Sequence, residues 1–166
     1  MRSIRAKHNM IAVSAFNMET AINTFQTLDL TLVASMNDMI AIKPRRETNV
    51  DEATGKEEPD LIYDMGKTSE LPLNFDKAQP QHFALLYAYA LGAITSAAAG
   101  TGYLHTITPI DGDLETTRSL PSLTCAHRLG KTVARERVAS LFVNEVTATF
   151  ARDSFCKVAS SLIGTG

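Results

Sequence analysis

The sequence predicts a mainly β, α+β domain: an antiparallel β-sandwich or partly closed barrel with one packed amphipathic helix and a long C-terminal β-hairpin. Runs rich in β-branched and aromatic residues recur between short turn segments, which is typical of strands. Only residues 80–91 carry a clear helical spacing of apolar side chains. With 166 residues, the chain is long enough for a single domain, 1–166, with a substantial core.

The C-terminal hairpin is predicted from two β-rich runs, Val138–Phe150 and Phe155–Ile163, which are separated by residues 151–154. If Ala151 faces Ser154, the ribbon has an apolar face and a Thr/Ser-rich face, and a one-residue shift of register would exchange them. The apolar face carries Phe142, Val146, Ala148, Phe150, Phe155, Ala159 and Ile163. The polar face carries Val143, Glu145, Thr147, Thr149, Cys156, Val158, Ser160 and Leu162.

The first 68 residues contain weaker signals. Residues 1–17 have no pattern and are predicted to be an N-terminal arm, while residues 28–32 alternate as a half-buried strand does and 36–42 is a second short candidate. Residues 43–68 are dense in charge with a single aromatic residue, Tyr63. Such a segment buries too little apolar area to join a core, so we expect a long projecting loop.

Regular elements return after residue 68. Residues 69–76 alternate strictly, and Pro72 within them predicts an edge strand or a proline that points out of the ladder. A helix is expected over Pro80–Leu91, with proline in its first turn and Gly92 as its stop. The remaining segments are a small-residue linker at 97–102, strands at 103–108 and 122–128, and an acidic loop at 109–119 between them.

Composition excludes several classes of function. The formal net charge of −2 provides no basic footprint for nucleic acid. Residues 83–99 are uncharged but mostly alanine, which is too weakly apolar for a membrane span. Cys125 and Cys156 are interpreted as buried thiols in a reducing compartment, with a disulfide or metal pair as the alternative.

Chemical motifs are weak. Gly66-Lys67-Thr68 and Gly130-Lys131-Thr132 resemble the end of a phosphate-binding loop but lack its earlier glycine. His105 and His127 fall in different predicted strands, and a zinc site would have to combine them with the cysteines. We therefore expect neither an enzyme nor a resident cofactor or metal.

Three successive stretches resemble the tail tube proteins of tailed bacteriophages. The first is 66–75 followed by 77–92, a strand that leads into a helix ending in Leu-Gly. The second is 102–109, with the form Tyr-x-His-Thr-hydrophobic-Thr-Pro, and 120–124 downstream. The third is 143–150 with its partner strand, which ends in Gly164-Thr165-Gly166. Together they cover about residues 66–166.

The resemblance implies a virion structural protein, assembled in the host cytoplasm, whose rings, usually hexameric, stack into a hollow tube. DNA would pass through the lumen without specific binding, and other tail proteins (terminator, baseplate or hub, tape measure) would be partners, with no membrane involved. The polar hairpin face would line the lumen, with Glu145, Thr147, Thr149 and Ser160 as candidates. The charged loop would contact a neighbouring subunit or the next ring through Glu52, Lys56, Glu57, Glu58 and Asp60.

Three alternatives stay open beside this hypothesis, of which the simplest is a soluble monomeric β domain whose role the sequence does not indicate. A tail completion, baseplate or adaptor protein with the same fold would not polymerise. A small-molecule or metal-dependent protein would use His105, His127 and the cysteines. Members of the family often continue beyond the Gly-Thr-Gly that ends this chain, so the sequence is interpreted as either a short member or a truncated one.

Overall fold

The computed structural model describes residues 9–14, 18–19, 21–33, 35, 38–50, 52, 55, 61–110, 120–130 and 134–165. These residues form nine strands and one helix: β1 Asn9–Val13, β2 Leu30–Leu32, β3 Ala41–Thr48, β4 Ile62–Phe75, α1 Pro80–Leu91, β5 Gly92–Ala99, β6 Gly102–Pro109, β7 Leu123–Leu129, β8 Ala134–Thr149 and β9 Lys157–Thr165. The mainly β, antiparallel class with one helix is thus confirmed, and the sheet does not close into a barrel.

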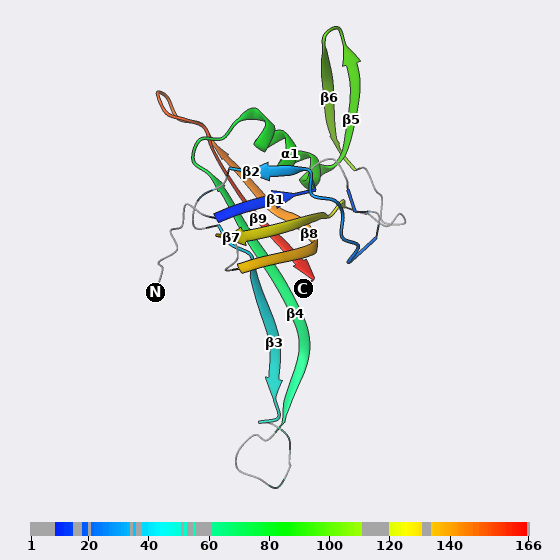
Figure 1. Cartoon of the computed structure of the whole chain (residues 1–166), viewed down its shortest axis with the longest axis vertical. Helices are drawn as coiled ribbons and strands as arrows, with labels where there is room; N and C mark the ends of the chain where they lie inside the picture. The colour runs from blue at the N-terminus through cyan, green and yellow to red at the C-terminus, as the bar shows by residue number, and fades with distance from the viewer. Residues whose placement is uncertain are drawn as a thin grey trace.

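The main sheet has seven antiparallel strands in the order β2-β1-β7-β8-β9-β4-β3, while β5 and β6 form a separate two-stranded ribbon. Figure 1 shows three parts: a central body, the β3–β4 ribbon that leaves it at one end, and the β5–β6 ribbon that leaves it at the other. The β8–β9 hairpin is confirmed and lies at the centre of the sheet order.

β8 bends because it carries two irregularities. One lies opposite Thr124, where Ser140 adopts a positive φ of 54°, and the other lies between Val143 and Glu145. Extra residues of this kind increase the bend and twist of a strand. Its first half pairs with β7 and its second half with β9. The bend between these halves folds the sheet, so that the β7 side and the β9 side pack against each other around a core (Figure 1).

The core is one cluster that joins the two halves of the sheet. Ile11 of β1, Leu71 of β4 and Leu162 of β9 are all at most 2% exposed and belong to it. Helix α1 adds Leu86 and Tyr89, and the Tyr89 hydroxyl donates a hydrogen bond to the Ser14 carbonyl at 2.7 Å. The burial of Tyr89 is therefore accompanied by a partner for its polar end.

Helix α1 covers the predicted residues 80–91 and ends at the predicted glycine. Gly92 has φ 95°, and its backbone N–H donates to the Ala88 carbonyl. A Cβ at this position would lie 2.5 Å from Cδ1 of Ile110, so both the backbone conformation and the space favour glycine. The predicted strands at 69–76, 103–108 and 122–128 are also confirmed, as parts of β4, β6 and β7.

Several predictions for the rest of the chain are wrong. Residues 9–13 of the predicted arm form β1, an internal strand, because Ile11 and Val13 alternate as buried side chains. The two ends of the predicted 43–68 loop, residues 43–48 and 62–68, form the paired β3–β4 ribbon, whose charged side chains suit a strand exposed on both faces. Residues 97–102 are the end of the β5–β6 ribbon rather than a linker.

Candidate functional site

The second half of β8, together with β9 and β4, presents a polar surface that we call the open face. Residues opposite each other on antiparallel strands project from the same side of a sheet. The register therefore places Thr147, Ala159 and Asn74 in one row, with Glu145, Ser161 and Pro72 in the next. Five of these six side chains are exposed and Ser161 is half-buried. The expected exposure of Glu145, Thr147 and Thr149 is thus observed.

Ser160 does not belong to this surface. It lies opposite Val146 on the core side and is 6% exposed, so its expected position on an exposed face is wrong. The physical reason is the turn: Thr149 pairs with Lys157, which shifts β9 by one residue from the predicted pairing and exchanges its faces. Val158 and Leu162 are consequently buried, whereas Ile163 is exposed.

Charges on and beside the open face are largely compensated. Lys157 Nζ lies 3.6 Å from the Asp76 carboxylate, and Lys43 Nζ lies 2.5 Å from the Glu70 carboxylate. The Thr147 hydroxyl donates to the Glu145 carboxylate at 3.3 Å. Exposed pairs of this kind contribute little to stability, but they reduce the positive potential that the two lysines would create. The surface is polar without being basic.

The β3–β4 ribbon projects away from the body without a core of its own. All eight residues of β3 are exposed, as are Ile62 and Met65 of β4. Near its end, the Tyr63 hydroxyl donates to the Glu52 carboxylate at 2.7 Å, and this hydrogen bond raises the pKa of Tyr63. The other four residues proposed for subunit contact, Lys56, Glu57, Glu58 and Asp60, lie outside the described residues.

The β5–β6 ribbon differs from β3–β4 in having no acidic or basic residue except His105. Tyr103 and Leu104 are 75% and 61% exposed, and the Nδ1 atom of His105 lies 2.7 Å from the Ser96 hydroxyl. An isolated two-stranded ribbon is marginally stable in water, and exposed strand edges invite pairing with another chain. Both ribbons are therefore candidate contact surfaces.

A polar cluster around Glu19, which the sequence did not indicate, fastens the segment before β2 to the bend in β8. The Glu19 carboxylate accepts hydrogen bonds from the Ser122 and Thr124 hydroxyls at 2.7 and 2.6 Å, and from both the backbone N–H and the hydroxyl of Ser140. Burial acts to raise the pKa of Glu19, but these hydrogen bonds outweigh it and the pKa is lowered. Asn23 N–H in turn donates to the Ser140 hydroxyl.

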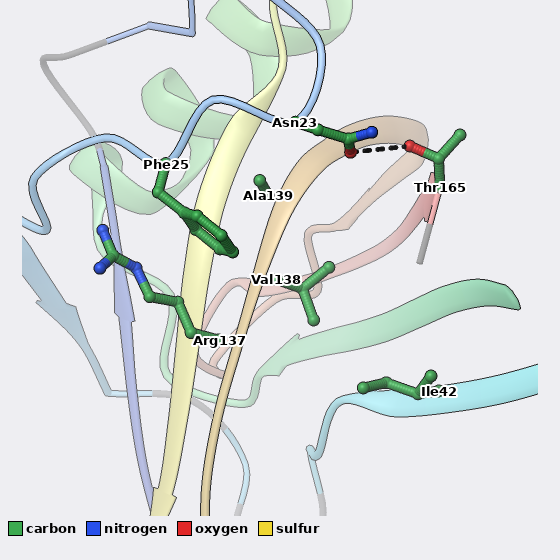
Figure 2. Close-up of a pocket in the computed structure, with 7 residues that line it drawn as sticks. All are labelled: Asn23, Phe25, Ile42, Arg137, Val138, Ala139 and Thr165. Atoms are coloured by element: carbon green, nitrogen blue, oxygen red, sulfur yellow. Dashed lines mark hydrogen bonds between the residues drawn. The ribbon is translucent and has the colours of Figure 1, made fainter.

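A hollow of about 250 Å³ lies where this segment meets the ends of β9 and β3. Figure 2 shows its lining: Asn23, Phe25, Ile42, Arg137, Val138, Ala139 and Thr165. The Arg137 guanidinium lies 4.8 Å from the centre of the Phe25 ring and donates to the Gln26 carbonyl at 2.6 Å. The lining is mainly apolar, with this one cation.

The residues considered for metal or nucleotide chemistry are not brought together. His105 is on the exposed β6, whereas His127 and Cys125 are buried in β7, at 1% and 0% exposure. Gly66-Lys67-Thr68 lies within the extended strand β4, a geometry that cannot wrap a phosphate. In the described part of the chain, no group of three or more histidine, cysteine, aspartate or glutamate side chains is placed to hold a metal ion.

No protein-family model matches the sequence, and no curated protein matches it significantly. Within the described ranges, no helix is long and apolar enough to cross a membrane.

Proposed function

We propose that this chain is a virion structural protein, the subunit of stacked rings that form a hollow phage tail tube through which DNA passes. The observation that carries the proposal is the open face, a polar sheet surface on which Lys157 has a carboxylate partner, as Lys43 has beside it. A conduit for a polyanion needs such a wall, because unpaired lysines and arginines would retain DNA by counterion release. Glu145, Thr147 and Thr149 would line it.

The ribbons support the same proposal from a different side. Each presents exposed apolar residues on strands that no core stabilises, such as Met65 in β4 and Tyr103 in β6. Contacts with neighbouring subunits would bury these side chains and pair the free edges, as strand addition does in other assemblies. In this proposal the β3–β4 ribbon makes the intersubunit contact that the sequence predicts for the charged loop, with a neighbour in the same ring or in the next ring.

Negative-stain electron microscopy of the purified chain over a concentration series tests the assembly, together with light scattering for its mass. We expect rings or tubes with a central hole wide enough for a DNA duplex. A chain that stays monomeric at every concentration, or forms single rings that never stack, would refute the tube and favour an adaptor or completion protein of the same fold.

Reactivity of single cysteines tests the position of the open face. In a Cys156→Ser background, Thr147→Cys should react with a bulky maleimide-polymer reagent in the dispersed chain and become protected in tubes. Asp64→Cys on the exposed β3–β4 ribbon tests whether that ribbon lines the lumen instead, and Val33→Cys, which is 82% exposed and outside the open face, reports general loss of reactivity. Equal reactivity of Thr147→Cys in both states would contradict a lumenal position.

A further inference from the structure

The turn between β8 and β9 carries two exposed aromatic side chains. Phe150 is 77% exposed and Phe155 is 66% exposed. Between them lie Arg152 and Asp153, whose side chains are 96% and 88% exposed. Figure 1 shows this turn, residues 150–156, leaving the body as a projecting loop, which we call the tip. Large exposed apolar groups on a projecting loop indicate a contact site, because water is a poor solvent for both rings.

The hollow described above lies at the other end of the same strand. β9 leaves the tip at Lys157 and reaches the hollow at Thr165, one of its lining residues (Figure 2). Nine residues of extended chain separate the two sites by roughly 27 Å. Each copy therefore carries an aromatic projection at one end of β9 and a mainly apolar recess at the other.

We propose that the tip of one copy inserts into the hollow of a second copy, with Phe150 and Phe155 against Phe25, Ile42 and Val138. A projection and a recess on different ends of one molecule make a heterologous contact, which repeats instead of closing between two copies. The inference rests on the proposed function. Strands in a barrel wall run from one rim to the other, so their ends face the rings above and below. The contact would therefore join successive rings.

Charge complementarity supports a second copy as the occupant. The single charged group that lines the hollow is Arg137, whose guanidinium has more N–H donors than its contact with Gln26 uses. Asp153 sits at the apex of the tip with an 88% exposed side chain and a positive φ of 59°. Its carboxylate lies 3.5 Å from Nε of Arg152, an exposed ion pair that contributes little energy in water and can exchange for a more buried partner. The Asp153 carboxylate would meet Arg137 when the rings of the tip enter the hollow.

The area of the contact predicts how it behaves. Two phenylalanine side chains bury roughly 300–500 Å² on their own side, which is below what a stable pair of proteins requires. Two isolated chains should therefore associate only weakly through this contact. When two rings make several such contacts at once, their overall affinity is far higher than that of a single contact. Stacking should therefore follow ring formation.

Disulfide trapping detects a weak contact and fixes its direction. In the full chain with Cys156→Ser, one variant carries Ser154→Cys at the tip and another carries Thr165→Cys at the hollow. Cys125 is fully buried and stays out of the reaction. Mixing the two variants under mild oxidation should give disulfide-linked tip–hollow dimers. Their yield should be about tenfold above that of a matched mixture in which Val33→Cys, an exposed site away from tip and hollow, replaces the tip cysteine. A chain with both cysteines should give a ladder of multimers.

Replacing both rings, by Phe150→Ser with Phe155→Ser, should lower the yield of tip–hollow dimers by at least tenfold, since each buried ring is worth about that much in affinity. Yields equal to the Val33→Cys control, or unchanged by loss of the rings, would overturn the contact. Tubes seen in micrographs without preferential trapping would overturn the contact and leave the proposed function standing. Efficient trapping in a chain that forms no rings or tubes would support the contact and refute the tube.

Discussion

The Glu19 carboxylate offers the sharpest test of how the segment before β2 is held against β7 and the bend in β8. Four donors from three residues converge on it: the hydroxyls of Ser122 and Thr124, and the N–H and hydroxyl of Ser140. Glu19→Gln keeps the size of the side chain but replaces one acceptor oxygen with an NH₂ donor. Hydroxyls can rotate to accept from it, but the backbone N–H of Ser140 cannot.

Hydrogen bonds to charged groups contribute roughly 1.5–3 kcal/mol each, and members of one network do not add fully. We therefore expect Glu19→Gln to lower the free energy of unfolding by about 2–4 kcal/mol, a large part of the 5–15 kcal/mol typical of a domain. Urea titration of the dispersed chain at neutral pH measures this loss as a shift of the midpoint. Glu70→Gln, which disrupts an exposed pair with Lys43, is the control and should cost less than about 1 kcal/mol.

The pH dependence gives a second, independent reading. The pKa of Glu19 is lower in the folded chain than its ordinary value of 4.5, so the folded state binds its proton less readily than the unfolded state. The stabilisation is thus complete above pH 4.5 and is lost as the pH falls through the folded pKa. Wild type and Glu19→Gln should converge in stability upon acidification below pH 4.5. A loss under about 0.5 kcal/mol at neutral pH, or a difference that stays constant in acid, would refute this account of the cluster.

Three further predictions concern other parts of the molecule. Leu71→Ala removes a side chain with 0% exposure from the core and should cost about 2–5 kcal/mol in urea unfolding, whereas Val33→Ala, at 82% exposure, should change little. Gly92→Ala should destabilise the chain by more than about 1 kcal/mol, because φ is 95° and Ile110 occupies the space that a Cβ would need. Gly100→Ala, with φ 62° and open space, should destabilise it less. Equal shifts of the thermal unfolding midpoint for the two variants would contradict the steric argument. Glu52→Gln should return the pKa of the Tyr63 phenol toward its ordinary value in a spectrophotometric titration, and an unchanged pKa would show that the hydrogen bond does not form in solution.

The elements that the sequence predicted well are those specified locally. Residues 80–91 carry their own start and stop signals, and the alternation of 69–76 places Leu71 and Phe75 inside and Pro72 outside. At Pro72, β4 pairs with β9 alone, because β3 begins at Ala41 opposite Glu70, so the missing N–H costs no ladder bond.

The errors arise where distant segments decide the outcome. The face of β9 depends on how many residues the turn uses and on the irregularity at Asn144, and neither leaves a pattern in the sequence. Glu19 finds its partners at Ser122, Thr124 and Ser140, more than 100 residues away, so a lone glutamate in a polar stretch gave no signal. Strand β1 leaves no signal in the sequence, because five residues are too few to show a period.

The position of β9 has a consequence for the order of events during synthesis. This strand lies between β8 and β4, so the β4–β3 pair joins the rest of the sheet only through residues 157–165. While residues 157–165 are still inside the ribosome, the emerged chain has two partial sheets that are not paired with each other, and the core between them stays incomplete. Folding must wait for contacts of long sequence separation, which are intrinsically slow to form. A chain that lacks residues 157–165 therefore cannot complete the seven-stranded sheet.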